Sequence, residues 1–290
     1  MRIVTKTFLA TLTLFISIMV SAQAFGFEVD GFKYNVIDGT TTVEIAGRAE
    51  GNNATDIVIP SSVTDSGITY AVTAFADSAF YDESGGLASL TSVTIPDSIT
   101  EIGKAVFKNN SYLTSVTIPD SVTTIDDQAF MSAGLTSVTI PDSVTTIGEQ
   151  AFYQNREYPS NKDTLTSVTI GNSVTSIGES AFERNTELTS VTIGNNVTTI
   201  GFGAFSYTGL TSVTIPANVT TIDGYAFSQS NLTYVAFLGD FGDFKSSIFR
   251  YNPDLATICT AAGASGWPQT YNVGTSSDQK DLTTTTCSFA

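Results

Sequence analysis

A repeating pattern of apolar and polar positions runs through the middle of the chain. Its unit, as it stands at Leu90–Phe107, reads Leu-Thr-Ser-Val-Thr-Ile-Pro-Asp-Ser-Ile-Thr-Glu-Ile-Gly-Lys-Ala-Val-Phe. The steps between the leading leucines are 22 or 23 residues, with one longer step of 30. A fixed period of this length predicts a solenoid in which each period forms one coil. Further copies lie at 113–130, 135–152, 165–182, 188–205 and 210–227, with a diverged copy at 232–249 and an upstream copy that ends at 79–80 and is split by an insertion around 62–70.

The apolar positions of one unit outline the cross-section of a coil. After the leucine, Val93 and Ile95 alternate with Ser92 and Thr94, which is the pattern of a short half-buried strand. Pro-Asp-Ser then marks a turn, because proline cannot donate to a strand ladder and the Asp and Ser side chains bond their own backbone. Two inward isoleucines follow on a second short extended segment, a glycine permits a bend, and Ala-Phe closes the coil in most copies.

The closing position is phenylalanine in eight copies. Stacked coils would bring these rings into one buried column. We favour a core over a cofactor-stacking site, because the column keeps register with the other apolar columns. The residues are Phe80, Phe107, Phe130, Phe152, Phe182, Phe205, Phe227 and Phe249.

The first 24 residues have the features of a secretory signal peptide. Arg2 and Lys6 are followed by a mostly apolar run over 8–20 and by the small-x-small sequence Ala22-Gln23-Ala24. The apolar run is too short to cross a membrane. The expected location is therefore secreted, cell-surface or periplasmic, with no membrane span after cleavage.

Composition excludes several kinds of function. The 290 residues include no histidine, which removes Ser-His-Asp and Cys-His nucleophile systems and histidine zinc sites. The formal charge is −16, and loss of the signal peptide leaves ten basic against 28 acidic residues, a charge of −18. So acidic a chain is not expected to bind nucleic acid. The sequence has no phosphate-binding loop, dinucleotide-binding motif or nucleophile elbow, and we expect no cofactor, no metal and no catalysis.

Segments at both ends of the repeat are expected to cap it. The dipeptides Asp30-Gly31 and Asp38-Gly39 lie between alternating segments, which predicts β-hairpins. Cys259 and Cys287 lie in an exported chain, so we expect a disulfide that ties the tail onto the last coil; a reactive thiol or a metal-binding pair is the alternative. The expected division is a signal peptide at 1–24, an N-terminal β cap at 25–56, repeats at 57–250 and a C-terminal cap or tail at 251–290.

The unit Leu-x-x-Val-x-Ile-Pro-x-x-Val-x-x-Ile-Gly-x-x-Ala-Phe resembles the BspA-like (treponemal) class of leucine-rich repeat, from Ile57 to about Phe249. The resemblance implies a repeat solenoid, mainly β: a leucine-rich-repeat horseshoe or gently curved right-handed solenoid with a parallel sheet. It also implies an extracellular or cell-surface protein used in adhesion and protein binding. The departures from the family pattern, none of which breaks an inward column, are Gly171 and Gly194 in place of proline, and Asp126 and Asp223 in place of glycine.

Two columns of hydroxyl side chains are expected on the outer side of the leucine-bearing strands. With strands about 4.8 Å apart, they would form a face about 30 Å long. This face either binds a protein or a glycan, or is a soluble β-compatible surface without a ligand, since Tyr234 is its only aromatic anchor. One column is Ser92, Ser115, Ser137, Ser167, Ser190, Ser212 and Tyr234; the other is Thr94, Thr117, Thr139, Thr169, Thr192 and Thr214.

Candidate anchor residues gather at the extra loop of the long step, 154–164. Tyr153, Arg156, Tyr158 and Lys162 make this the densest group of such residues in the repeats. We expect a specific partner to bind here first, the alternative being a tolerated surface insertion.

Two other functions remain open. A regular Ser-x-Thr array is similar to the threonine arrays of some ice-binding solenoids, which need a flat sheet. Asp97, Asp120 and Asp142 form a turn column that continues as Asn172 and Asn195, which favours turn formation over acid–base catalysis, with calcium binding as a minor variant. The overall prediction is an exported, monomeric, non-catalytic protein that recognises another protein or a surface polymer, with adhesion as one form of this role; a purely structural repeat is the alternative.

Overall fold

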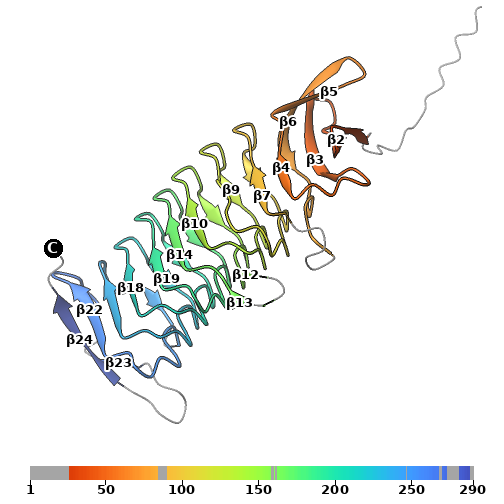
Figure 1. The fold of residues 1–290 in the computed structure, drawn as a ribbon. Helices are drawn as coiled ribbons and strands as arrows, with labels where there is room; N and C mark the ends of the chain where they lie inside the picture. Colours follow the sequence, from red (N-terminus) through yellow and green to blue (C-terminus); the bar gives the residue numbers. More distant parts are fainter. Residues whose placement is uncertain are drawn as a thin grey trace, which may run out of the picture.

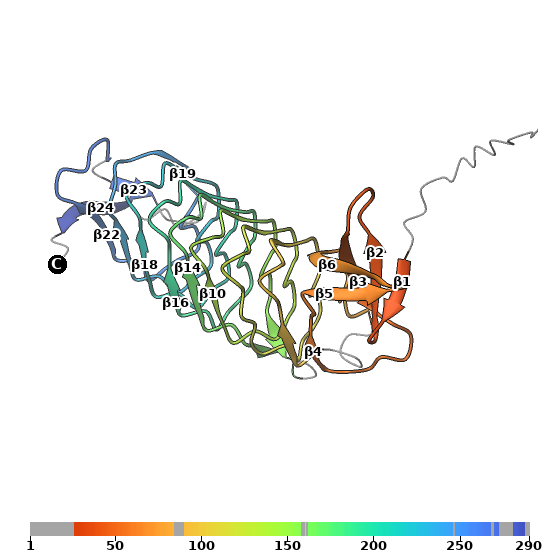
Figure 2. The same ribbon diagram turned by 90° about the horizontal axis from the view of Figure 1, so that it is seen from above.

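Each period of the sequence forms one coil, and the coils stack along an elongated, gently bent axis (Figures 1 and 2). The structure is a computed structural model, and it describes residues 26–83, 90–157, 160, 162–245, 247–267, 270–272 and 281–287. All regular elements of the described residues are strands. The fold is therefore the mainly β leucine-rich-repeat solenoid that the periodicity predicts.

The leucine-bearing strands are parallel and lie on one side of the stack. Like residues pair with like: in β10 and β14, Ser137 is opposite Ser167 and Ile140 is opposite Ile170. These strands are β4 (Asp56–Val58), β7 (Ser92–Thr94), β10 (Ser137–Ile140), β14 (Ser167–Ile170), β16 (Ser190–Thr192), β18 (Ser212–Ile215), β20 (Tyr234–Phe237), β22 (Thr257–Ala261) and β24 (Asp281–Cys287), which is followed at the sheet edge by the antiparallel β23 (Thr270–Asn272).

A second sheet of two-residue strands lies across the coil from the first. It is continuous over seven coils, and its register again places Thr146 opposite Ser176 and Ile147 opposite Ile177. The strands, in order, are β8 (Glu101–Ile102), β9 (Thr124–Ile125), β11 (Thr146–Ile147), β15 (Ser176–Ile177), β17 (Thr199–Ile200), β19 (Thr221–Ile222) and β21 (Asp243–Phe244).

The phenylalanine column forms the spine of the core, as predicted. Its eight rings, Phe80 to Phe249, stack with centroid separations of 5.1 to 5.9 Å and interplanar angles of 2° to 27°. Phe182, in the middle, has no exposed surface. Because each ring contacts one above and one below, the column couples every coil to its neighbours.

A column of mostly polar buried side chains, which the sequence analysis missed, lies three residues after the phenylalanine in the coils from Phe107 to Phe249. Asn185 is an example: its Oδ1 accepts from the Asn155 backbone N at 2.9 Å, and its Nδ2 donates to the Phe152 and Phe182 carbonyls at 2.9 and 2.8 Å. Asn110 Nδ2 donates to the Phe80 carbonyl of the preceding coil, and Asn252 Nδ2 donates to the Phe227 carbonyl of the preceding coil and to the Phe249 carbonyl of its own. These amides satisfy backbone groups that the turning chain leaves unpaired inside the core.

The N-terminal cap is a five-stranded sheet in the order β1-β2-β3-β6-β5 (Figure 2). The two Asp-Gly turns join its first three strands as antiparallel hairpins, as predicted. The insertion after β4 forms the last hairpin of this sheet, and Phe75 at its end packs edge-on against Phe107 at 5.5 Å. The strands are β1 (Gly26–Val29), β2 (Phe32–Val36), β3 (Thr42–Arg48), β5 (Ser62–Asp65) and β6 (Ile68–Phe75).

Aromatic residues close the other end of the core. The Trp267 ring lies 4.4 Å from Phe237 and 5.1 Å from Phe241, and its Nε1 donates to the Gly239 carbonyl at 3.1 Å. Strands β22 and β24, which carry Cys259 and Cys287, are hydrogen-bonded neighbours. The Cys287 side chain lies outside the described residues, so the disulfide stays a prediction.

Candidate recognition surface

The hydroxyl columns lie on the outer side of the leucine-bearing strands. Their serines and threonines are exposed from Ser92 to Thr214, apart from the half-buried Ser167, and Tyr234 at the end of the row is also half-buried. The valines between them, such as Val168 and Val213, face the core.

Two kinds of hydroxyl can be told apart by their hydrogen bonds. A separate set of threonines bonds the preceding coil: Thr145 Oγ1 donates to the Thr123 carbonyl at 3.2 Å, and Thr166 Oγ1 donates to the Thr136 carbonyl at 3.0 Å. The hydroxyls of the outer columns from Ser115 to Thr214 make no hydrogen bond to any described residue. They are therefore free to bond a ligand, whereas the bonded threonines serve the fold.

The outer sheet is interrupted, which the sequence analysis did not foresee. The segment 113–118 forms no strand, and β16 does not pair with β18. At the paired junction of β18 with β20, the residue that follows the strand is Leu238, and its N–H donates to the Ile215 carbonyl of the previous coil at 3.0 Å. Proline cannot donate this bond. The outer strands fail to pair where the second of the two coils has a proline after its strand segment, at Pro119, Pro141 and Pro216. Strands β4 and β7 are the exception, because they pair although Pro96 follows β7.

The loop at 154–164 forms a small hairpin tied down at its base. Strands β12 (Arg156–Glu157) and β13 (Lys162–Asp163) pair antiparallel. Asp163 accepts hydrogen bonds from the Thr186 backbone N and hydroxyl, and the Thr164 hydroxyl donates to the Leu135 carbonyl at 2.9 Å. The hairpin is thus fixed to the coils on both sides. Tyr158 lies outside the described residues.

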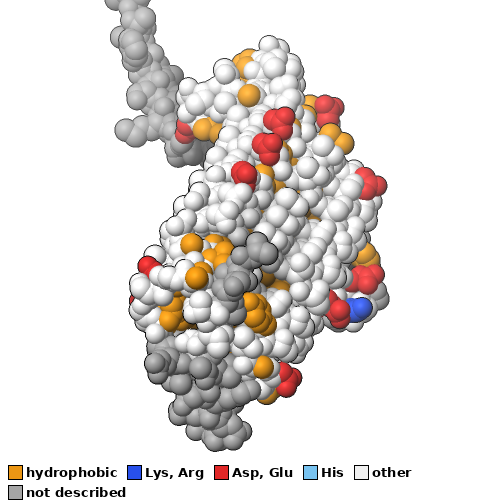
Figure 3. Space-filling model, turned by 90° about the vertical axis from the view of Figure 1, so that its left-hand side faces the viewer, with side chains coloured by type: hydrophobic (Ala, Val, Ile, Leu, Met, Phe, Trp, Pro, Cys, Tyr) orange, Lys and Arg blue, Asp and Glu red, His pale blue; other side chains and the backbone are white. Residues whose placement is uncertain are grey.

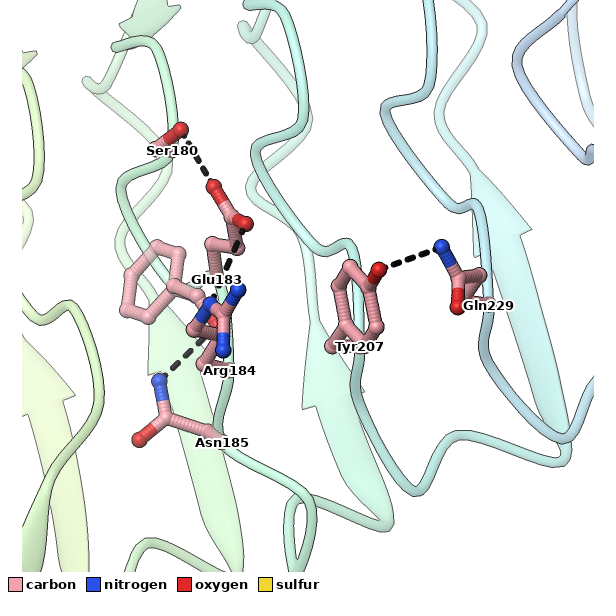
Figure 4. Close-up of polar contacts among 7 residues, drawn as sticks. Ser180, Glu183, Arg184, Asn185, Tyr207 and Gln229 are labelled. Carbon is pink, nitrogen blue, oxygen red and sulfur yellow. Dashed lines mark hydrogen bonds and ion pairs between the residues drawn. The ribbon is translucent and has the colours of Figure 1, made fainter.

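Tyr153, at the start of this loop, extends into a group of side chains on the next coils. Its phenol lies near the charged side chains of Arg184 and Glu183, and burial raises its pKa. The Arg184 guanidinium lies 5.1 Å from the centre of the Tyr207 ring, and Gln229 Nε2 donates to the Tyr207 hydroxyl at 2.5 Å (Figure 4). Glu183 accepts from Ser180 at 2.6 Å and lies 3.7 Å from Arg184 Nε. The structure therefore joins the loop to residues that the sequence analysis did not select.

A second group of the same kind follows along the same corner of the coils. Phe202 and Tyr225 meet at 5.4 Å, and Arg250 lies 5.9 Å from the Tyr225 ring and 5.0 Å from the Tyr251 ring. Arg250 also donates to the Tyr225 hydroxyl at 2.9 Å. Phe202 is 47% exposed and Tyr251 40% exposed. We call the two groups together the tyrosine–arginine corner, which comprises Tyr153, Arg184, Phe202, Tyr207, Tyr225, Arg250 and Tyr251.

Four of these residues have a left-handed backbone conformation, which recurs at the equivalent positions of most other coils. Arg184, Tyr207, Tyr225 and Tyr251 have φ between 55° and 63°. This left-handed region costs a bulky side chain more than it costs Asn or Gly. Asn109 occupies the equivalent position of Arg184 in an earlier coil. The sequence could have located this corner by a simple signal. Aromatic and arginine residues stand at left-handed turn positions that Asn or Gly would occupy with less strain.

The aspartate column is engaged in the turns. Asp142 accepts from the Asn172 backbone N, and the Asn172 side chain accepts from the Asn195 backbone N at 3.1 Å. Among the described residues, no group of three or more Asp, Glu, Cys or His is placed to hold a metal ion. At the start of the outer face, hydrogen bonds from Thr91 and Ser92 lower the pKa of Asp56, which keeps this carboxylate charged.

The face of the molecule at its C-terminal end is polar and sparsely charged (Figure 3). Seen from the C-terminal end, most of it is neither hydrophobic nor charged, and acidic side chains predominate among the charged ones (Figure 3). No helix long and apolar enough to cross a membrane occurs in the part of the chain that the structure describes.

Comparison with known proteins agrees with this architecture. A crystal structure of a leucine-rich repeat protein from T. pallidum is similar over 79% of this chain and 89% of that chain, with 24% identity and a TM-score of 0.54. One from Bacteroides ovatus is similar over 81% of this chain and 70% of that chain, with 23% identity and a TM-score of 0.52. No curated protein matches the sequence. The model of the BspA type leucine-rich repeat region matches residues 73–161 and 160–256, in six copies. The chain belongs to the BspA-type leucine-rich repeat family.

Proposed function

We propose that the chain is an exported, non-catalytic recognition protein that binds another protein through the tyrosine–arginine corner and the adjoining hairpin 156–163. The observation that carries this proposal is the gathering of partly exposed Tyr, Phe and Arg side chains on one corner of the solenoid. Tyr and Arg supply most of the binding energy in protein interfaces, because they bury a large area and also donate hydrogen bonds.

The geometry of the corner supports binding in two ways. Arg184 and Arg250 are held against tyrosine rings, so little side-chain entropy is lost when a partner covers them. Tyr207, Tyr225 and Tyr251 occupy turn positions whose left-handed conformation recurs in most coils, so their side chains project from a fixed backbone. A strongly acidic chain that places two arginines here favours a partner with acidic groups at the contact.

Export is the second part of the proposal. It is supported by the signal peptide at 1–24, which lies outside the described residues, and by the two cysteines, which suit an oxidising compartment. The absence of histidine from the sequence supports a recognition role rather than acid–base or nucleophilic catalysis.

Capture of cell-surface and matrix proteins by the mature chain tests this proposal. N-terminal sequencing of the exported protein should first give Phe25. One variant combines Arg184→Ala and Tyr207→Ala; another replaces 157–162 with Asn-Gly, which keeps the buried Asn155 and the Thr164 anchor and closes the hairpin with a two-residue turn. For the protein that the wild type captures, we expect affinity to fall at least tenfold in the first variant and measurably in the second.

A matched control is the double variant Ser137→Ala and Thr139→Val on the outer face. It removes two exposed hydroxyls that make no hydrogen bond to a described residue. It should leave the melting temperature unchanged and the affinity for the partner within twofold of wild type. Equal affinity of the wild type, the control and both corner variants would refute the corner as the binding surface.

A further inference from the structure

The coils separate on one side between β16 and β18. On the other side of the same two coils, β17 and β19 pair in the continuous sheet. The opening forms a cleft of about 310 Å³, lined by Ser190, Thr192 and Asn195 on one wall and by Ser212, Thr214 and Pro216 on the other. Val191 within it is only partly buried, whereas the equivalent Val168 and Val213 are 2% and 3% exposed.

The cleft lies where one position of the repeat is Gly194 in one coil and Pro216 in the next coil. Gly194 comes so close to the preceding coil that a Cβ on it would lie 2.1 Å from the Gly171 carbonyl oxygen, and β16 is drawn onto β14. In the following coil the same position is Pro216, which has no N–H to give to the Ile193 carbonyl. The strands on either side, β14 with β16 and β18 with β20, remain paired.

The chemistry of the lining is uncharged and rich in hydroxyls. Among the described residues that line the cleft, none is charged and none is aromatic. The four hydroxyls of Ser190, Thr192, Ser212 and Thr214 have no partner within the described chain, and the facing edges of β16 and β18 lack the main-chain bonds of a paired strand. Hydroxyls donate and accept, and edge strands present both N–H and C=O groups.

We propose that this cleft binds a neutral sugar residue of a polysaccharide. A pyranose ring carries a set of hydroxyls that also donate and accept, which matches both the side chains and the free main-chain groups of the walls. The absence of charge in the lining disfavours ionic ligands, and the absence of aromatic rings disfavours a nucleobase. The volume is at the lower end of the range of about 300–1,000 Å³ for small-ligand sites, which fits a small group better than a long peptide. This site is separate from the tyrosine–arginine corner and does not depend on it.

Titration of the mature protein with tetrasaccharides of glucose, mannose, xylose and N-acetylglucosamine, followed by calorimetry or NMR, tests the proposal. We expect at least one to bind with a dissociation constant of about 0.1–1 mM, as befits a few neutral hydrogen bonds. Pro216→Gly should restore the missing donor, close the cleft and weaken binding at least tenfold, with an unchanged or higher melting temperature. Thr192→Val combined with Ser212→Ala should weaken binding at least fivefold.

The matched control is Thr139→Val combined with Ser167→Ala, which alters the same column positions at the closed junction of β10 and β14. It should bind the sugar within twofold of wild type. Failure of all four sugars to bind at 10 mM would overturn the proposal, as would undiminished binding by Pro216→Gly. Saturable binding of a capped Thr-Val-Thr-Val-Thr peptide in place of the sugars would assign the cleft to a peptide strand and equally overturn it.

Discussion

Replacement of Phe182 by Ala should lower the free energy of unfolding by about 4 kcal/mol, within the range for deletion of a buried aromatic ring. The Phe182 ring has no exposed surface and stacks on Phe152 at 5.2 Å and on Phe205 at 5.1 Å. Its removal leaves a cavity between two coils and breaks the spine in the middle of the stack. Urea unfolding followed by circular dichroism measures the change.

Phe202→Ala is the control for this loss. Phe202 is 47% exposed and lies one coil away, so its replacement should cost no more than about 1 kcal/mol. Because a repeat protein can unfold in segments, hydrogen exchange should also show the largest loss of protection in the coils next to Phe182. Equal destabilisation by the two variants would contradict the stacked column.

Asn185→Ala should cost about 3 kcal/mol, the second largest effect. The side chain bonds one backbone N–H and two carbonyls in the buried interior, and its loss leaves all three groups without that partner. Asn185→Thr should cost less, because Thr208 occupies the equivalent position in the next coil and bonds its corner carbonyl at 3.0 Å.

Thermal and urea unfolding of these variants, with Asn196→Ala as an exposed control, measures the effect. The control should change stability by less than about 0.5 kcal/mol. If Asn185→Ala and the control have the same free energy of unfolding, the buried amide column does not contribute to stability.

The apolar skeleton could be predicted from the sequence because burial repeats with the period. The leucine, valine, isoleucine and phenylalanine columns recur at fixed offsets, and Asp-Gly dipeptides mark the hairpins of the N-terminal cap. The position of the buried amides could not be predicted in this way. The same place in successive coils holds Asn110, Ala133, Asn155, Asn185 and Thr208, so no single residue type marks it.

The candidate site was located only in part. Tyr153 and Arg156 were selected at the extra loop, but Arg184 and Tyr207 belong to the next two coils. Stacking brings Arg184 near Tyr153 and Tyr207 near Arg184. The outer sheet is interrupted at three of the four junctions that lead to a proline, which has no backbone N–H to donate. Gly171, Gly194 and Pro216 in successive coils carry that information, but its meaning depends on how closely neighbouring coils approach, which the sequence does not state.

The central claim is that successive coils stack with like residues above like. Disulfide formation in the double variants Thr146→Cys/Ser176→Cys and Thr146→Cys/Thr199→Cys, read by peptide mass mapping, tests it most directly. Thr146 and Ser176 are paired neighbours, whereas Thr199 lies one coil further, about 9.6 Å from Thr146 and too far for a disulfide. We expect a cross-link in the first variant and none in the second; a cross-link in the second alone, or equal cross-linking in both, would contradict in-register stacking of the coils.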